Sequence, residues 1–293
     1  MLYAGICLAA LRSPYLVRAQ PPGGGGGGGG GVGGVEGGTD SDLTEFCDEE
    51  GTGADYSEQL SGSNSTMERA VASTKGCPNH VNWEINPNPA REIASDTIIP
   101  AYPMLMASYA TTDLSSEAGA VGIGLNGVSI FSSWARDQAD SYEASAFYIE
   151  GDTFDLCGGH ATTEGWYHYH STPGCLQEQA MVAAGTTKDE HSPQIGWSYD
   201  GFPVYGQLGP GGVEMLLCSS SLADDTYCLD SCSGYEGELD GVDEFKYRYY
   251  SSCGFDESYF PFTTNCFRGC CPTGMTCDDH VEACDEDAEE GYT

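Results

Sequence analysis

Four of the six histidines of this 293-residue chain stand close together, at positions 160, 168, 170 and 191. His168 and His170 are separated by one residue, and alternate side chains of a strand share a face, so their imidazoles would project side by side. A transition metal takes three or four protein ligands, and imidazole suits both zinc and copper. His160 and His191 are the available third and fourth ligands. The spacing therefore predicts one zinc or copper ion in a histidine cluster.

Residues 155–175 and 230–253 look like two copies of one unit. Each copy opens on Asp-x-Cys, continues to a four-residue run that alternates Tyr with other residues, and ends at a cysteine. Where the first copy has three of its histidines, the second has Tyr235, Arg248 and Tyr250. Arginine only donates hydrogen bonds and cannot ligate a cation. The metal is therefore predicted in the first copy alone.

The 14 cysteines show no C-x-x-C zinc-ribbon spacing, which favours a disulfide framework. Disulfides persist in oxidising compartments, so we expect a secreted or cell-surface protein. Equal placement in the two copies predicts the bonds Cys157–Cys175 and Cys232–Cys253, and further predicted pairs are Cys218–Cys228 and Cys47–Cys77. Four more cysteines close to the C-terminus predict a small disulfide-stapled appendage, with a metal cluster as the alternative: Cys270, Cys271, Cys277 and Cys284.

The chain carries a formal net charge of −35 and only 10 Lys and Arg. Phosphate binding needs clustered basic groups, so nucleic acid is excluded as a partner. A metal ion or an extracellular ligand is the expected partner. No apolar stretch approaches the roughly 18 residues or more of a membrane span.

Four segments follow from composition. Residues 1–19, with a short apolar run, resemble a signal peptide. Residues 20–75 contain nine consecutive glycines and many Ser, Thr and acidic residues, which predict a disordered arm. Residues 76–269 are long enough for one core domain, and residues 270–293 form the cysteine-rich acidic tail.

The expected fold is β-rich, with mainly antiparallel short strands, few short helices and disulfides. Asn126-Gly127 between two alternating apolar runs predicts a hairpin, because both positions of a type I′ turn need positive φ. Helical pattern is confined to residues 136–144 and 176–184. Further short strands are expected at residues 97–102, 146–150, 166–171, 195–199 and 246–251.

Several motifs together resemble the YHYH-domain family, whose name is the one-letter code of the run from Tyr167 to His170. The resemblance implies a secreted or surface protein built from YHYH units and assigns no activity. Family members often carry a second such motif, where this chain has Tyr247-Arg248-Tyr249-Tyr250. The other matching motifs are Cys77-Pro78-Asn79-His80, Phe154 to His160, His191-Ser192-Pro193, Asp200 to Gly206 and Cys266-Phe267-Arg268-Gly269.

Three functions are compatible with these patterns. The first is metal binding by the histidine cluster. The second is metal-dependent hydrolysis, with water at an open position and Glu164 or Asp155 as the base; the sequence lacks G-x-S-x-G and H-E-x-x-H, so an enzyme is not favoured. The third is an extracellular interaction or carbohydrate-binding module that uses Trp166 and Trp197, the histidines then being hydrogen-bonded parts of a sheet face.

Overall fold

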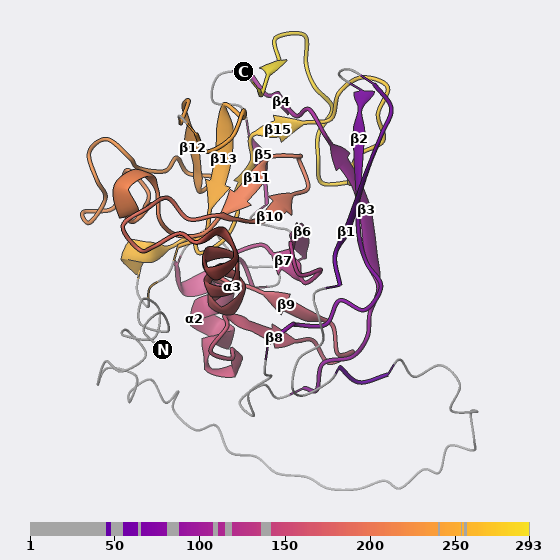
Figure 1. Ribbon diagram of the computed structural model, residues 1–293, viewed down its shortest axis with the longest axis vertical. Helices are drawn as coiled ribbons and strands as arrows, with labels where there is room; N and C mark the ends of the chain where they lie inside the picture. Colours follow the sequence, from indigo (N-terminus) through magenta and orange to yellow (C-terminus); the bar gives the residue numbers. More distant parts are fainter. Residues whose placement is uncertain are drawn as a thin grey trace, which may run out of the picture.

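An eight-stranded sheet forms the centre of the computed structural model (Figure 1). The pairings within it are antiparallel except for two, and helices are few and short, so the predicted β-rich fold with antiparallel short strands is confirmed. The structure describes residues 45–47, 55–63, 66–80, 88–107, 111–114, 119–135, 142–239, 241–252, 254 and 257–292. The possible signal peptide of residues 1–19 lies outside this described part.

The central sheet has the strand order β12-β13-β11-β10-β6-β7-β9-β8. Its middle pair, β10 and β6, is antiparallel, and β8 and β12 are its two edges. The tyrosines of β9 and β13 are fully buried in the core, which explains why these short strands carry so many aromatic residues. The bounds are β6 (Ala120–Gly124), β7 (Ser129–Phe131), β8 (Gly159–Ala161), β9 (Tyr167–Tyr169), β10 (Gln194–Ser198), β11 (Pro203–Tyr205), β12 (Gly234–Glu236) and β13 (Tyr247–Tyr250).

Both halves of this sheet have the same pattern of pairing. From the centre outward, β6 and β10 each pair antiparallel with the next strand, β7 and β11. Each of these runs parallel to β9 or β13, which in turn pairs antiparallel with β8 or β12. The two-copy interpretation of residues 155–175 and 230–253 stays a prediction, and this shared pattern supports it.

The hairpin predicted at Asn126-Gly127 connects β6 to β7. Gly127 has φ +87°, and a Cβ there would stand 2.3 Å from the carbonyl oxygen of Asp55, so this position needs glycine. Asn126 is not among the described residues with positive φ, so the turn differs from the type I′ that we expected. Its side chain is buried instead, where Nδ2 donates to the Tyr169 hydroxyl at 3.0 Å.

A second sheet begins inside the segment predicted as a disordered arm. It contains β1 (Ser57–Ser61), β2 (Glu68–Ser73) and β3 (Ser95–Pro100), all antiparallel, at the right-hand side of Figure 1. Tertiary contacts hold β2 in place: Val71 is fully buried, and the Arg69 guanidinium lies 3.9 Å from the centre of the Trp197 ring. These partners are distant in the sequence, so the polar composition of the segment conceals them.

One predicted strand is a helix in the structure. Residues 146–150, expected as a strand, form the short helix α2 (Ala146–Glu150), because the Ser145 side chain caps it by accepting from the Tyr148 backbone N–H. The helix expected at residues 176–184 is confirmed as α3 (Gly174–Ala184). The helix expected at 136–144 lies mostly outside the described residues, and its end is the 3-10 turn η3 (Tyr142–Ala144). Further 3-10 turns are η4 (Gly151–Thr153), η5 (Pro210–Gly212) and η6 (Glu257–Tyr259).

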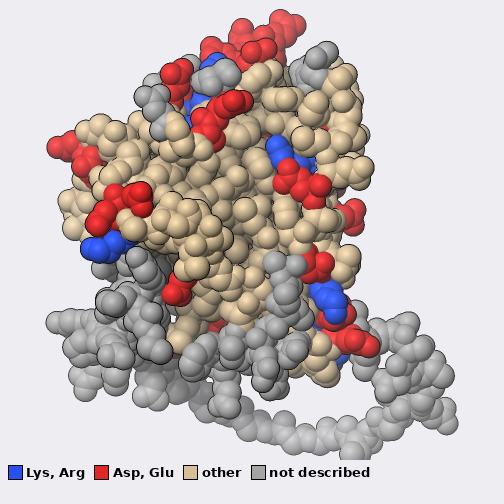
Figure 2. Space-filling view, in the orientation of Figure 1, with Lys and Arg blue, Asp and Glu red and all other residues tan. Residues whose placement is uncertain are grey.

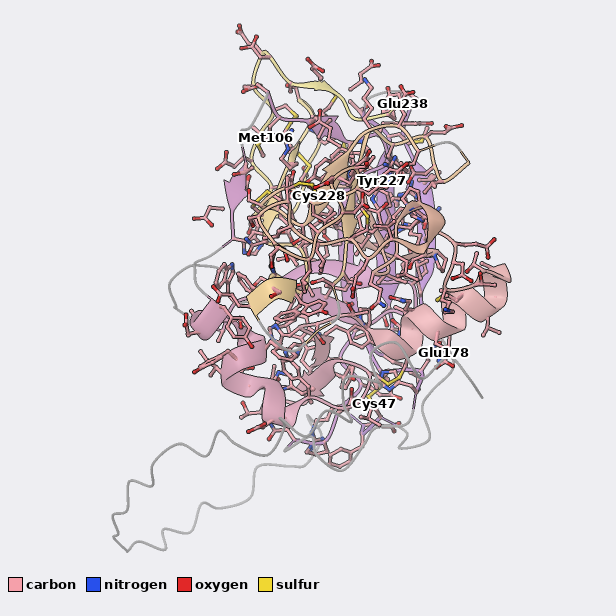
Figure 3. The ribbon with its side chains drawn as sticks, turned by 90° about the vertical axis from the view of Figure 1, so that its left-hand side faces the viewer. Cys47, Met106, Glu178, Tyr227, Cys228 and Glu238 are labelled. Carbon is pink, nitrogen blue, oxygen red and sulfur yellow. A yellow bond between two sulfur atoms is a disulfide. The ribbon has the colours of Figure 1, made fainter. Side chains whose placement is uncertain are left out.

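Six disulfides join the described cysteines. The predicted bonds Cys157–Cys175, Cys218–Cys228 and Cys47–Cys77 are confirmed, and Figure 3 labels Cys47 and Cys228. The predicted bond Cys232–Cys253 is wrong, because Cys232 pairs with Cys266, whose strand runs beside it with a Cα–Cα distance of 4.5 Å. Cys253 lies outside the described residues. The tail cysteines form Cys270–Cys284 and Cys271–Cys277, so the disulfide interpretation of the tail holds.

The tail is also paired with the main domain. Strand β15 (Gly269–Cys270) spans the predicted domain boundary and pairs with β4 (Met104–Leu105), which also pairs with β16 (Glu289–Glu290). Just before the boundary, β14 (Cys266–Phe267) pairs with β5 (Thr112–Asp113).

Among the described residues, no helix has the length and apolar character needed to cross a membrane.

Candidate metal centre

Three of the four predicted histidines come together at the β8 edge of the central sheet. His160 on β8 stands directly opposite His168 on β9. His170 directly follows β9, two positions after His168, and so projects from the same face. One ring nitrogen from each of the three lies within 4.8 Å of those of the other two. All three residues are buried, with His168 only 2 % exposed. Strand pairing and side-chain alternation together therefore build the cluster.

Hydrogen bonds at Nδ1 set the tautomer of each ring. His168 Nδ1 lies 2.9 Å from the Trp166 carbonyl oxygen, and His170 Nδ1 lies 2.8 Å from that of Ser132. A carbonyl oxygen can only accept, so both Nδ1 atoms carry the proton and each Nε2 keeps its lone pair. His160 Nδ1 lies 2.7 Å from the Thr153 hydroxyl, which already donates to a backbone carbonyl and so accepts from this ring. Each ring therefore offers Nε2 to a ligand.

Burial favours the neutral form of two of these imidazoles, those of His168 and His170. Burial, together with the smaller effect of the neighbouring His160, lowers the pKa of His170 to about 4. Burial also lowers the pKa of His168 well below its ordinary value, with the two neighbouring histidines adding to the effect. A neutral imidazole is the form that binds a metal. The cluster is thus ready for a cation at neutral pH without first releasing protons from these two rings.

Aromatic rings enclose the cluster. The Phe131 ring stacks on His168 with 3.8 Å between ring centres, and its edge meets His170. Phe154 contacts the edge of His160 at 4.9 Å and lies nearly parallel to His170 at 5.8 Å. These contacts restrict the rotation of the imidazoles and exclude water from the inner side of the cluster.

Glu150, which the sequence analysis missed, lies at the outer side of the cluster. Its Oε2 is 3.3 Å from His160 Nε2, and its side chain is 35 % exposed. The residue is the last of α2, in the segment that we expected to be a strand. No motif in the sequence singles out this glutamate among 45 acidic residues. Only the tertiary contact between α2 and β8 identifies it.

The fourth predicted ligand, His191, lies elsewhere. Its Nδ1 is 2.6 Å from the Ser192 carbonyl oxygen, and its Nε2 is 2.6 Å from the hydroxyl of Tyr250 on β13. Its ring packs edge-on against Tyr205 on β11. His191 precedes β10, and this places it in the half of the sheet that contains β11 and β13. The structure does not bring it to the other three histidines.

The two predicted bases are also outside the cluster. Asp155 Oδ2 accepts from the Tyr167 hydroxyl at 2.5 Å, and its Oδ1 accepts from the Cys157 backbone N–H at 2.8 Å, so this carboxylate organises the turn before β8. Glu164 is exposed and accepts from the Thr163 hydroxyl at 2.8 Å. Neither contact places a carboxylate oxygen at the imidazoles.

The tryptophans of the interaction-module hypothesis are not presented to solvent as a pair. Trp197 is 6 % exposed and lies beneath Arg69. Trp166 is half-buried, and its ring meets the edge of Phe131 at 5.1 Å. Both rings thus contribute to packing, as aromatic residues in a core usually do.

A second group of possible ligand atoms surrounds a disulfide. One ring nitrogen of His80 and the sulfur atoms of Cys157 and Cys175 lie within 4.8 Å of one another. The two sulfurs are bonded to each other, so neither is the thiolate that a metal requires. Tyr169 and Tyr167 place their hydroxyl oxygens 3.2 and 3.5 Å from His80 Nε2. In this oxidised form the group has a structural role.

Comparison with known proteins assigns the family. A family model described as YHYH protein matches residues 96–259, which is more than half of the chain. The chain belongs to the YHYH protein family. The resemblance expected from the sequence motifs is thereby confirmed, and the YHYH run supplies His168 and His170 of the cluster. No curated protein and no solved structure matches the chain.

Proposed function

We propose that this YHYH protein binds one transition-metal ion, zinc or copper, through the Nε2 atoms of His160, His168 and His170. The observation that carries the proposal is the approach of one ring nitrogen from each of three buried histidines to within 4.8 Å of the others, together with Nδ1 hydrogen bonds that leave Nε2 of each neutral ring as the acceptor. Lone pairs that face one another at low dielectric repel, and a cation relieves this repulsion. Hydrogen-bonded core histidines would not need to converge in this way.

The three imidazoles and the oxygen atoms that contact their Nδ1 atoms match what metal sites require. Histidine ligands in metal sites donate their second ring N–H to a carbonyl, a carboxylate or water, which fixes the ring orientation. All three Nδ1 atoms here contact oxygen, and two of these oxygens are backbone carbonyls. Imidazole suits zinc and copper equally in type, so these contacts support either ion.

The charge of the chain favours the same partner. The net charge of −35 creates a negative potential that attracts cations and raises their association rate at low salt. Figure 2 shows Asp and Glu side chains in several separate patches on the face in view. An acidic surface of this kind concentrates divalent ions near the protein.

Elemental analysis of the full-length protein, purified without a His tag and dialysed against zinc or copper, tests the proposal. We expect one ion per chain for the wild type and none for His168→Ala. The matched control is His191→Ala, which removes a histidine outside the cluster and should keep the full stoichiometry. A wild-type protein without affinity for either metal at neutral pH would refute the proposal.

We also propose that the protein is secreted or displayed at the cell surface. Six disulfides among the described residues need an oxidising compartment to form and persist. Fractionation of the producing cells, followed by thiol labelling of the protein in each fraction, tests this. Recovery of the chain in the cytosol with reduced cysteines would contradict it.

A further inference from the structure

We propose that Glu150 is the fourth protein ligand of the same ion, so that the site contains three histidines and one carboxylate. This inference rests on the proposed metal binding, and it goes further by closing the coordination shell. It is carried by the position of the Glu150 carboxylate relative to His160, which the sequence motifs do not indicate.

The distance between the two atoms is that of neighbouring ligands on one ion. Zinc–nitrogen and zinc–carboxylate bonds are about 2.0–2.2 Å, and a tetrahedral arrangement then separates adjacent ligand atoms by about 3.3–3.5 Å. Glu150 Oε2 and His160 Nε2 are 3.3 Å apart. An ion bonded to His160 Nε2 therefore has this carboxylate as a neighbour, and because Glu150 lies outside the group of three mutually close ring nitrogens, a rotation of its side chain completes the approach to the other two imidazoles.

The hydrogen bond at His160 Nδ1 directs Nε2 toward the carboxylate. This Nδ1 atom donates to the Thr153 hydroxyl, so in the neutral ring Nε2 is an acceptor, and the facing carboxylate oxygen is an acceptor as well. A ring nitrogen and a carboxylate oxygen at this distance are held together by a proton on the ring or by a metal ion between them. A metal ion at the cluster would replace that proton and be shared with His168 and His170, each of which has a ring nitrogen within 4.8 Å of one on His160.

The chain holds Glu150 against both nitrogens of the His160 ring. Its carboxylate faces Nε2, while its carbonyl oxygen accepts at 2.6 Å from the Thr153 hydroxyl that contacts Nδ1. The Ser145 cap fixes the start of α2, and η4 follows directly after Glu150. The backbone of Glu150 is therefore positioned by the same hydrogen-bonded unit that orients the imidazole.

Burial indicates the route of the ion and the order of assembly. The side chain of His160 is 10 % exposed, whereas that of Glu150 is 35 % exposed and so lies on the solvent side. The carboxylate meets an incoming cation first, and the three imidazoles then take it inward. In the bound state the carboxylate covers the ion from outside.

A fourth protein ligand changes the chemistry of the site. A hydrolytic centre needs three protein ligands and a water in the open position, whereas a closed four-ligand shell is typical of structural sites. The carboxylate is a hard, anionic ligand, so it favours Zn²⁺ or Cu²⁺ over Cu⁺. The site is thus suited to holding a divalent ion rather than to activating water.

Cobalt, as a spectroscopic substitute for zinc, tests the role of Glu150 in the full-length protein. We compare wild type, Glu150→Ala and Glu150→Asp by zinc competition against a chelator and by the visible spectrum of the Co²⁺ form. The matched control is Glu164→Ala, which removes an exposed glutamate from the loop between β8 and β9. Circular dichroism confirms that each variant is folded.

We expect Glu150→Ala to weaken zinc binding about tenfold or more and to shift the cobalt bands as water replaces the carboxylate. Azide should then bind to the cobalt of Glu150→Ala but not of wild type, and formate should restore the wild-type spectrum. Glu164→Ala should behave as wild type, and Glu150→Asp should fall between wild type and Glu150→Ala.

Two results would overturn the inference, and they differ from each other. A Glu150→Ala protein with unchanged zinc affinity and cobalt spectrum would show that Glu150 is no ligand, while the three-histidine site would stand. A wild-type protein that binds neither zinc nor cobalt would remove the proposed function together with this inference.

Discussion

The hairpins β8–β9 and β12–β13 have the same antiparallel strand pairing but differ in their side chains. In the first, His160 pairs with His168, and at the same register positions of the second, Tyr235 pairs with Arg248. The preceding turns are organised alike: Asp155 and Asp230 each accept from two backbone N–H groups and from a tyrosine hydroxyl. The scaffold is therefore independent of the histidines.

The two hairpins handle positive charge differently. The Arg248 side chain is fully buried, and its guanidinium donates to both carboxylate oxygens of Asp243 at 3.1 and 2.9 Å and to two backbone carbonyls. The second hairpin thus contains its own cation. The first has neutral imidazoles at the matching positions and would take its cation from solution. The same strand pairing thus contains a buried ion pair in one hairpin and a cluster of imidazoles in the other.

The largest expected effect is loss of the metal on His170→Ala. The variant lacks one of three imidazoles, and the packing that positions the cluster cannot supply another nitrogen, so zinc should bind far more weakly. Tyr250→Ala, at the matching position of β13, should retain one ion per chain. Isothermal titration with zinc measures both. Equal binding by the two variants would remove the distinction between the hairpins.

The next effect concerns stability in the second hairpin. Asp243→Ala leaves Arg248 as a buried charge without its carboxylate, which costs about 3–5 kcal/mol of unfolding free energy. His168→Ala in the metal-free protein removes a neutral ring and should cost clearly less. Urea unfolding at pH 7 compares the two. Similar losses would mean that the first hairpin also depends on a charged pair.

The metal-free protein should lose stability as the pH falls from about 6.5 to about 4. Burial lowers the folded-state pKa of His170 to about 4. Between about pH 6.5 and pH 4, the unfolded chain therefore binds a proton at this residue and the folded protein does not. The uptake favours unfolding by roughly 3 kcal/mol for this group, and the stability is intact above the unfolded pKa. His170→Phe should flatten this part of the profile of urea midpoint against pH, and an unchanged slope in that variant would contradict the prediction.

The smallest effect should be the same in both hairpins. Tyr167→Phe and Tyr247→Phe each remove a hydroxyl that donates to the turn aspartate, at 2.5 Å to Asp155 and at 2.9 Å to Asp230. Hydrogen bonds to a charged group contribute about 1.5–3 kcal/mol. Thermal unfolding should show similar losses for the two variants. A large loss in one alone would contradict the equivalence of the scaffolds.

Local patterns in the sequence predicted much of the site. Alternation along β9 placed His168 and His170 on one face, and the Asn-Gly turn located the β6–β7 hairpin. The bond Cys157–Cys175 followed from its spacing within the unit. These features depend on residues close together in the chain, where backbone geometry leaves few alternatives.

Residues far apart in the chain account for the errors. His191 lies near the cluster in sequence but in the other half of the sheet, beside Tyr250. Cys232 pairs with Cys266 because β14 passes next to it, not with the cysteine that its own unit offered. Strand β2 lies in a polar segment that becomes ordered against Trp197. In each case packing between distant parts of the chain determines the partner, and the spacing of residues in the sequence does not indicate it.

By itself, the sequence determined the type of protein: a disulfide-bonded β-rich chain of the YHYH family with histidines grouped in one unit. The periodicity of side chains and the number of cysteines are properties of the sequence alone, so they can be determined without knowledge of the fold. Only the tertiary structure decided which side chains lie together: Glu150 lies beside His160, and His191 lies in the other half of the sheet beside Tyr250. That choice depends on α2 meeting β8, and such long-range contacts exist only once the core has packed.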